Sequence, residues 1–194
     1  RKHWEKNNYS ETFRFLQIST DEVFGSLSKE NEKFYEKYPY NPQSPYSASK
    51  ASADHLVQAW GNTYGIPVLR SNCSNNYGPF HYPEKLIPLA ITNIFKGKEI
   101  PIYGDGSNIR DWLHVYDHCA ALELILLSAR IGESFCIGGD NQITNLELIQ
   151  KICLLMNKFN DHKNTKFKDA TKLIKFVEDR KGHDYRYSVS NKKI

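Results

Sequence analysis

Short apolar runs alternate with longer segments of helical periodicity along most of the chain. Runs typical of strands lie at residues 13–19, 66–72, 99–103, 134–139 and 173–178. Segments with apolar residues at helical spacing lie at residues 46–64, 83–97, 116–130 and 145–158. The first two strands and the helix between them predict a right-handed strand–helix–strand crossover. The pattern therefore predicts an α/β protein with a buried parallel strand at 13–19.

Prolines, glycines and capping residues set the expected ends of these helices. Pro45 ends any earlier helix, and Gly61 and Gly65 mark the far end of the helix that follows it. In the next helix, Pro83 suits a first-turn position, whereas Pro88 should kink or split it. Thr144 is the expected N-cap of the helix at 145–158. Residues 20–45 are expected to form a long loop or lid.

Tyr46 and Lys50 stand four residues apart at the start of a predicted helix, so they share one face. A lysine ammonium beside a tyrosine favours the phenolate and lowers the tyrosine pKa, which makes the phenol a usable base. This spacing is also common on solvated helix faces. The proline-rich loop before the helix makes us favour the catalytic interpretation.

An acid pair, Asp21 and Glu22, follows the apolar run that ends at Ser19 and Thr20. Catalytic groups in open α/β sheets gather at such strand ends. Adjacent residues on a strand point to opposite faces, so both acids reach one substrate only if the strand has already ended there. A solvated turn would be the preferred interpretation without the tyrosine pair.

Composition narrows the function classes. The net charge of +4 fits an anionic ligand, and no nucleic-acid-binding motif occurs. The four cysteines lack metal-ligand spacing, so we expect no metal site, and reduced thiols suit a cytoplasmic protein. No apolar stretch approaches the roughly 20 residues that span a bilayer, and the first residues have no signal-peptide character.

A glycine-rich dinucleotide-binding loop is missing from the start of the sequence. Such a loop lies within a strand–helix–strand unit of roughly 30 residues, and too few residues precede the strand at 13–19 to hold one. The sequence is therefore expected to be the C-terminal part of a longer protein, and to start inside one of its helices.

Several segments resemble the dTDP-glucose 4,6-dehydratases, a family of the extended short-chain dehydrogenase/reductase superfamily. The segments are ISTDEVFG, SPYSASKASADHLVQAW, NCSNNYGPFHYPEKLIP, IYGDGSNIRDWLHVYDH, FCIGG and EDRKGHDYRY. The resemblance implies a Rossmann-like, doubly wound parallel sheet with a smaller mixed α/β substrate-binding domain. It assigns residues 1–75 to the C-terminal part of the NAD-binding Rossmann domain, and residues 76–194 to the substrate-binding portion with the remaining Rossmann elements.

The resemblance also implies roles for the residues singled out above. Tyr46 takes the proton of the carbon 4 hydroxyl of a hexose, helped by Lys50 and Thr20. Glu22 removes the carbon 5 proton, and Asp21 protonates the departing hydroxyl. The hydride carrier is NAD, since no side chain accepts hydride. Cofactor-binding residues are then Ser19, Tyr46, Lys50 and Asn76.

The implied partner is a dTDP-sugar, bound by Thr20, Asn75, Glu84, Lys85, Leu86, Pro101, Tyr103, Arg110, Asn145, Arg180 and His183. Arg110 is the best diphosphate candidate because guanidinium binds phosphate bidentately, although a surface pair with Asp111 is a rival interpretation. Lys181 replaces the family's usual proline and loosens the turn at Arg180.

Two alternatives stay open at this point. Another nucleotide-sugar dehydratase or an epimerase shares the fold, although the acid pair argues against an epimerase. An inactive fragment is the alternative from another class, supported by the missing glycine loop. We expect the complete enzyme to be a homodimer working in deoxysugar synthesis for polysaccharide, and the chain by itself to purify without NAD.

Overall fold

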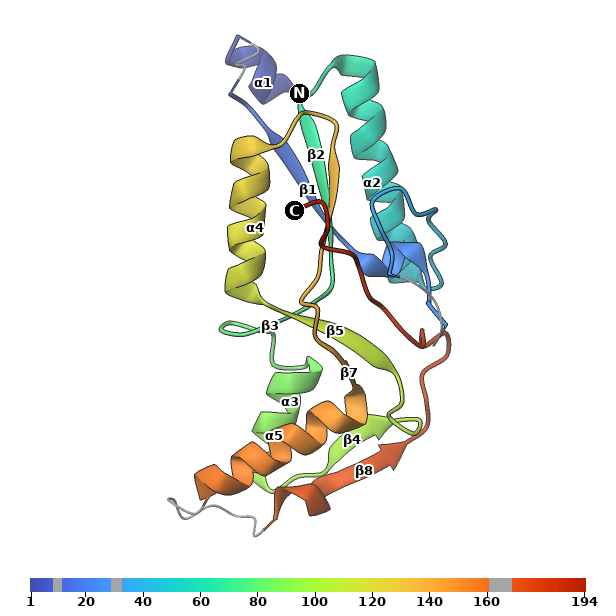
Figure 1. Cartoon of the computed structure of the whole chain (residues 1–194), viewed down its shortest axis with the longest axis vertical. Coiled ribbons are helices and arrows are strands. Elements are labelled where there is room, and N and C mark those ends of the chain that lie inside the picture. The colour runs from blue at the N-terminus through green and yellow to red at the C-terminus, as the bar shows by residue number, and fades with distance from the viewer. Residues whose placement is uncertain (9–11, 29–32, 161–168) are drawn as a thin grey trace.

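The computed structural model describes residues 1–8, 12–28, 33–160 and 169–194. The molecule is elongated, with one group of elements around a parallel sheet and a second group beyond it (Figure 1). Within the described residues, no helix has the length and apolarity needed to cross a membrane.

A three-stranded parallel sheet forms the first group. It contains β1 (Phe15–Thr20), β2 (Val68–Cys73) and β6 (Ser134–Ile137) in the order β1-β2-β6. Helices α2 (Pro45–Tyr64) and α4 (Val115–Ser128) flank the sheet on its two sides (Figure 1). The predicted parallel pair joined through a helix is confirmed.

The edge strand of this sheet differs from the expectation of a buried strand. Only the last two residues of β1, Ser19 and Thr20, are buried, whereas Phe15 and Ile18 are exposed, Ile18 by 47%. The reason is that β1 pairs with β2 alone among the described strands. The buried end of β1 is therefore the end that leads into the acid pair.

A second group packs α3 (Leu86–Lys96) and α5 (Asn145–Asn160) against the parallel pair β4 (Ile100–Tyr103) and β8 (Ile174–Val177). Its core includes Ile94, Ile102 and Ile149, all almost fully buried. Thr144 caps α5, since its Oγ1 accepts from the Glu147 amide at 3.1 Å. That cap was predicted.

Helix α3 begins later than predicted and is not broken by its proline. Pro83 lies before the helix, and Pro88 is the third helical residue. Amides in the first turn have no intrahelical acceptor, so a proline there removes no hydrogen bond. The expectation of a kink at Pro88 was wrong for this reason.

Three short strands were not predicted and link the two groups. They are β3 (Asn75–Tyr77), β5 (Ile109–His114) and β7 (Gln142–Thr144), in the order β3-β5-β7. β3 is parallel to β5, and β7 is antiparallel to it. The remaining short elements are α1 (Lys2–Lys6) and two 3-10 helices, η1 (Asp21–Phe24) and η2 (Ala170–Leu173).

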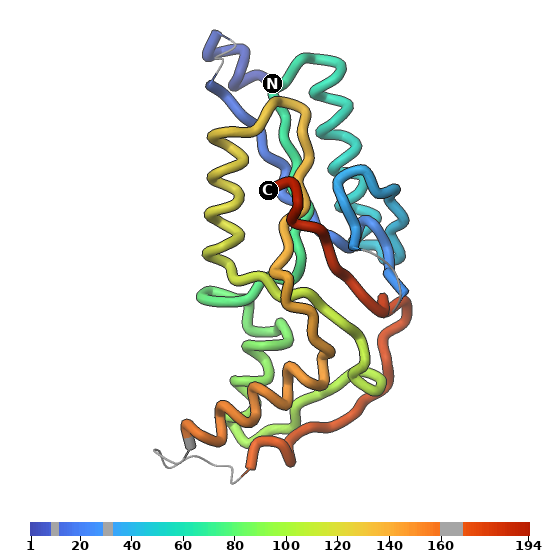
Figure 2. The backbone as a smooth tube through the Cα atoms, viewed as in Figure 1, coloured from blue at the N-terminus to red at the C-terminus, as the bar shows by residue number. Residues whose placement is uncertain are grey.

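The segment at 184–189 runs back from the second group along the first (Figure 2). The Ile109 amide donates to the Tyr185 carbonyl at 2.8 Å, and the Leu27 amide donates to the Arg186 carbonyl at 2.9 Å. The segment therefore fastens the residues after η1 to β5. Part of the predicted 20–45 loop, residues 29–32, lies outside the described residues.

Candidate active site

The acid pair lies where β1 gives way to η1. Thr20 is the last strand residue and the N-cap of η1, and its Oγ1 accepts from the Glu22 amide at 3.3 Å. The same hydroxyl donates to Asp21 Oδ1 at 3.3 Å. Because the strand has ended, the alternation of side chains no longer separates the two acids. The solvated-turn interpretation does not hold, since Asp21 is only 2% exposed.

Burial, followed by the neighbouring charge of Glu22, raises the pKa of Asp21 from 3.8 to about 8, against a lowering by Arg110. Asp21 is thus mostly protonated at neutral pH and can donate a proton. Its Oδ2 is buried and has no partner among the residues that the structure describes. Burial also raises the pKa of Glu22, while the charge of Arg110 opposes that rise.

Tyr46 enters the site from the second position of α2. Ser44 and Ser47 form a capping box that fixes the helix start, with Pro45 as the first helical residue. The phenol is 55% exposed. Partial burial raises the Tyr46 pKa, and the charges of Glu22, Cys73 and Asp21 raise it too.

The predicted lowering of the Tyr46 pKa was wrong for this structure, because burial and the nearby acidic groups raise it. Lys50 Nζ donates to the Ile18 carbonyl at 2.7 Å, so the ammonium is held by β1. Two further N–H groups of Lys50 remain for other acceptors.

Arg110 and Asp111 do not form the surface pair considered as a rival. Asp111 is fully buried and accepts from the Gly139 and Asn141 amides at 3.0 and 2.7 Å. Arg110 is 8% exposed, and its guanidinium donates to the carbonyls of Ile109, Tyr185 and Asp184.

Two residues beside Arg110 were missed in the sequence. The Tyr187 ring lies 4.5 Å from the guanidinium carbon of Arg110, and the Tyr187 hydroxyl donates to Asp184. The Asp184 charge raises the Glu22 pKa. No local pattern reveals these residues, because they reach the site from more than 70 positions away.

Asn75 and Asn76 lie on β3, and His118 of α4 contacts the second of them. His118 Nδ1 and Asn76 Oδ1 are 2.8 Å apart, and Asn76 Nδ2 donates to the Ser74 carbonyl at 3.1 Å. Burial lowers the His118 pKa, which keeps the ring neutral. Asn75 Oδ1 is buried with no partner in the described part of the chain.

Helix α3 brings Lys85 toward the acid pair. Lys85 is the N-cap residue and Leu86 the first helical residue, while Glu84 is exposed before them. The Lys85 charge lowers the pKa of Glu22. Ser19, at the end of β1, turns its hydroxyl inward and donates to Asp54 at 2.6 Å.

Most of the remaining predicted residues gather at the second group of elements. Pro101 and Tyr103 share the face of β4 opposite the buried Ile100 and Ile102. The guanidinium of Arg180 lies 4.1 Å from the centre of the Tyr103 ring.

His183 and Asn145 complete the predicted set. His183 Nδ1 pairs with Asp179 Oδ1 at 2.7 Å. Asn145 begins α5, and its buried Oδ1 has no partner among the described residues. A polar pocket of about 470 Å³ includes His183 and Asp184, so it adjoins Arg110, which donates to the Asp184 carbonyl.

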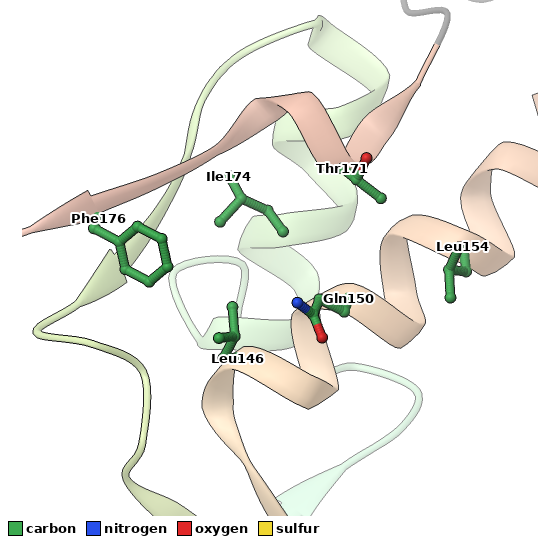
Figure 3. A pocket seen from close by; sticks show the side chains of 6 residues that line it. All are labelled: Leu146, Gln150, Leu154, Thr171, Ile174 and Phe176. Carbon is green, nitrogen blue, oxygen red and sulfur yellow. The ribbon is translucent and has the colours of Figure 1, made fainter.

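A second pocket of about 490 Å³ lies between α5 and the η2–β8 segment (Figure 3). Its lining is Leu146, Gln150, Leu154, Thr171, Ile174 and Phe176. It contains no ionisable side chain, and none of the predicted site residues lines it.

The chain is similar in sequence to known dehydratases. The family model for GDP-mannose 4,6 dehydratase matches residues 1–194. The dTDP-glucose 4,6-dehydratase of Neisseria meningitidis serogroup B is 50% identical over 196 residues, covering 100% of this chain and 55% of that protein. The Haemophilus influenzae enzyme of the same name is 54% identical over 183 residues, covering 94% and 54%. The chain thus spans about half the length of these relatives.

Solved dehydratase structures are also similar to this chain. The dTDP-glucose 4,6-dehydratase from Bacillus anthracis in complex with NAD superposes with a TM-score of 0.84 at 46% identity, covering 99% of this chain and 56% of that one. DesIV from Streptomyces venezuelae, with NAD and TYD bound, gives 0.82 at 42%, covering 93% and 52%. The resemblance inferred from the sequence and the Rossmann-type α/β fold are confirmed. The match over its whole length shows that this chain belongs to the GDP-mannose 4,6-dehydratase family.

Proposed function

We propose that the protein that contains this chain dehydrates dTDP-glucose to dTDP-4-keto-6-deoxyglucose with NAD. The observation that carries the proposal is a protonated acid, Asp21, next to a second carboxyl group, Glu22, at the end of a parallel strand and within electrostatic reach of Tyr46. Loss of water needs an acid for the leaving hydroxyl and a base for a carbon-bound proton. Two carboxyl groups in different environments can divide these tasks.

The residues have separate tasks in this proposal. Tyr46 accepts the carbon 4 hydroxyl proton, and Lys50, one turn away, stabilises the phenolate. Glu22 then removes the carbon 5 proton, which the carbon 4 ketone has made acidic. Asp21 gives its proton to the carbon 6 hydroxyl, which leaves as water. Thr20, whose hydroxyl lies between the strand and Asp21, binds the carbon 4 oxygen.

NAD, when bound, supplies the hydride acceptor for carbon 4 and the hydride donor for carbon 6. The donor set fits such a group, because Lys50 uses one of its three N–H groups on Ile18 and keeps two for ribose hydroxyls. Tyr46, Asn76 and the backbone around Ser19 would complete the contacts.

The proposed nucleotide site extends from Arg110 toward β4. Arg110 donates three hydrogen bonds to backbone carbonyls, which fixes the plane of its guanidinium for a diphosphate. Tyr103, covered on one face by Arg180, offers a surface for the pyrimidine. Further contacts are proposed from Asn75, Glu84, Lys85, Leu86, Pro101, Asn145 and His183.

Several wider predictions belong to the same proposal. Residues 1–75 belong to the NAD-binding domain, and residues 76–194 to the substrate-binding portion with the remaining Rossmann elements. The complete protein is a cytoplasmic homodimer that serves deoxysugar and polysaccharide synthesis. The four cysteines are free thiols, which suits a reducing compartment.

The alternative is a nucleotide-sugar epimerase, since UDP-glucuronic acid 4-epimerase from Bacillus cereus superposes with a TM-score of 0.75 at 27% identity. An epimerase has no leaving hydroxyl to protonate, so the protonated Asp21 favours the dehydratase.

Mass spectrometry of the product distinguishes a dehydratase from an epimerase. The protein is incubated with NAD and with dTDP-, UDP- or GDP-glucose. A dehydratase yields a product that has lost one water, fastest from dTDP-glucose, whereas an epimerase leaves the mass unchanged. Turnover that persists in Asp21→Asn and Glu22→Gln would refute the assigned roles. The chain by itself is proposed to purify without NAD, and bound NAD would contradict that.

A further inference from the structure

A third polar residue follows Tyr46 and Lys50 on the same face of α2. Asp54 stands four residues after Lys50, so the three side chains succeed one another at each turn. Asp54 differs from the other two in being fully buried, with 0% exposure. It therefore lies where the catalytic face of α2 meets the sheet.

One carboxylate oxygen of Asp54 collects three hydrogen bonds. Its Oδ2 accepts from Ser19 Oγ at 2.6 Å, from the Tyr40 hydroxyl at 2.9 Å and from Asn72 Nδ2 at 3.5 Å. Asn72 Nδ2 also donates to the Thr20 carbonyl at 3.1 Å. Asp54 thus holds the last two residues of β1, directly and through Asn72.

The elements joined at Asp54 are those that carry the proposed chemistry. Ser19 directly precedes Thr20 and the acid pair on the β1–η1 segment. Asp54 itself comes from α2, which carries Tyr46 and Lys50. The Asp54 contacts therefore set the acid pair at a fixed place relative to the tyrosine.

Stability alone does not account for a carboxyl group at this place. No ion pair reaches Asp54 within the described residues, and Lys50, one turn before it, binds Ile18. Its Oδ1 is buried and has no partner in the described part of the chain. Burying a carboxyl group with one oxygen unsatisfied costs free energy that an apolar residue would avoid.

We propose that Asp54 is a positioning residue, which holds Asp21 and Glu22 in register with Tyr46 through Ser19, Tyr40 and Asn72. Its catalytic consequence rests on the proposed function. Weakening Asp54 would displace the acid pair more than Tyr46, because Tyr46 sits on the same helix as Asp54. Loss of water should then slow more than oxidation at carbon 4.

The test compares Asp54→Asn with a matched control, Asp111→Asn. Asp111 is equally buried and its charge also acts on Asp21, but its hydrogen bonds go to Gly139 and Asn141 and not to this network. The first readout, hydrogen exchange, needs no cofactor. Because hydrogen bonds to charged acceptors are roughly twice as strong as neutral ones, we expect amides at 19–25 to exchange about tenfold faster in Asp54→Asn. Exchange in β6 should stay unchanged, and Asp111→Asn should leave residues 19–25 unchanged.

The second readout is the partition between the two chemical steps in the full-length protein. We expect reduced nicotinamide to accumulate during turnover by Asp54→Asn, seen by its near-ultraviolet absorbance, because water loss has become slow. Equal slowing of both steps, together with a uniform rise in exchange, would overturn the proposal and leave Asp54 a structural role.

Single-donor variants cover the case that Asp54→Asn does not fold. Ser19→Ala and Tyr40→Phe each remove one bond, and Ser188→Ala removes an equally buried hydroxyl outside the network as the control. The proposal expects faster exchange at 19–25 in the first two only, and no difference from the control overturns it. If the parent protein shows no turnover, the proposed function is refuted. The exchange result still tests the positioning role in that case.

Discussion

Replacing Asp21 with asparagine should stabilise the protein at neutral pH and abolish a pH dependence of its stability. Asp21 has a folded-state pKa of about 8, against an ordinary value of 3.8, chiefly because it is buried. Between these values the folded state binds more protons than the unfolded state. The free energy of unfolding therefore falls as the pH rises through this window.

The size of the effect follows from the two pKa values. At pH 7 the ordinary pKa lies about three units below the pH, and each unit corresponds to about 1.4 kcal/mol. Keeping Asp21 protonated in the folded state thus costs about 4 kcal/mol at pH 7 and about 1.6 kcal/mol at pH 5. Asparagine has the same shape and never ionises, so it removes this cost.

Urea unfolding of Asp21→Asn and the parent protein at pH 5 and 7 measures the difference. We expect the advantage of the variant to grow by between about 2 and 3 kcal/mol from the lower to the higher pH. Glu123→Gln, an exposed carboxyl group on α4, is the control and should show no such growth. An advantage that is the same at both pH values would refute the raised pKa of Asp21.

Three further variants test other parts of the structure. Tyr46→Phe should lower oxidation at carbon 4 by about 10²–10⁴-fold, measured as formation of reduced nicotinamide, and unchanged oxidation would exclude Tyr46 as the base. Glu22→Gln should leave that oxidation measurable and slow release of water, measured by mass spectrometry; normal release would reassign the base. Gly65→Ala should lower the free energy of unfolding by about 1 kcal/mol, because Gly65 ends α2 with a φ of 68°, and an unchanged urea midpoint would contradict this.

Elements with strong local signals were predictable from the sequence. Helix α2 has Ser44 and Pro45 at its start and Gly65 at its end, and the structure places it within a residue of the prediction. The strand β3 was missed because its three residues, two of them asparagine, have no apolar pattern. It is a strand only through its pairing with β5.

The residues of the candidate site likewise divide into those with a local sequence signal and those without one. The acid pair and Tyr46 could be singled out because each follows a recognisable strand or helix boundary. Asp184 and Tyr187 could not, since their contacts with Arg110 depend on how distant segments meet. The direction of the Tyr46 pKa was wrong because burial and the acid pair raise it, while the Lys50 ammonium binds the Ile18 carbonyl on β1.

The segment at 184–189 bears on the order in which the molecule assembles. The Tyr185 amide donates to Ser26 Oγ across a separation of 159 residues, and the same segment encloses Arg110. Closing so long a loop is slow, since its entropy is lost before the contacts form. We therefore expect β1, α2 and β2 to form early, while the surroundings of Arg110 are completed only after residues 184–189 leave the ribosome. A nascent chain halted before them would be folded in part and unable to build the proposed diphosphate site.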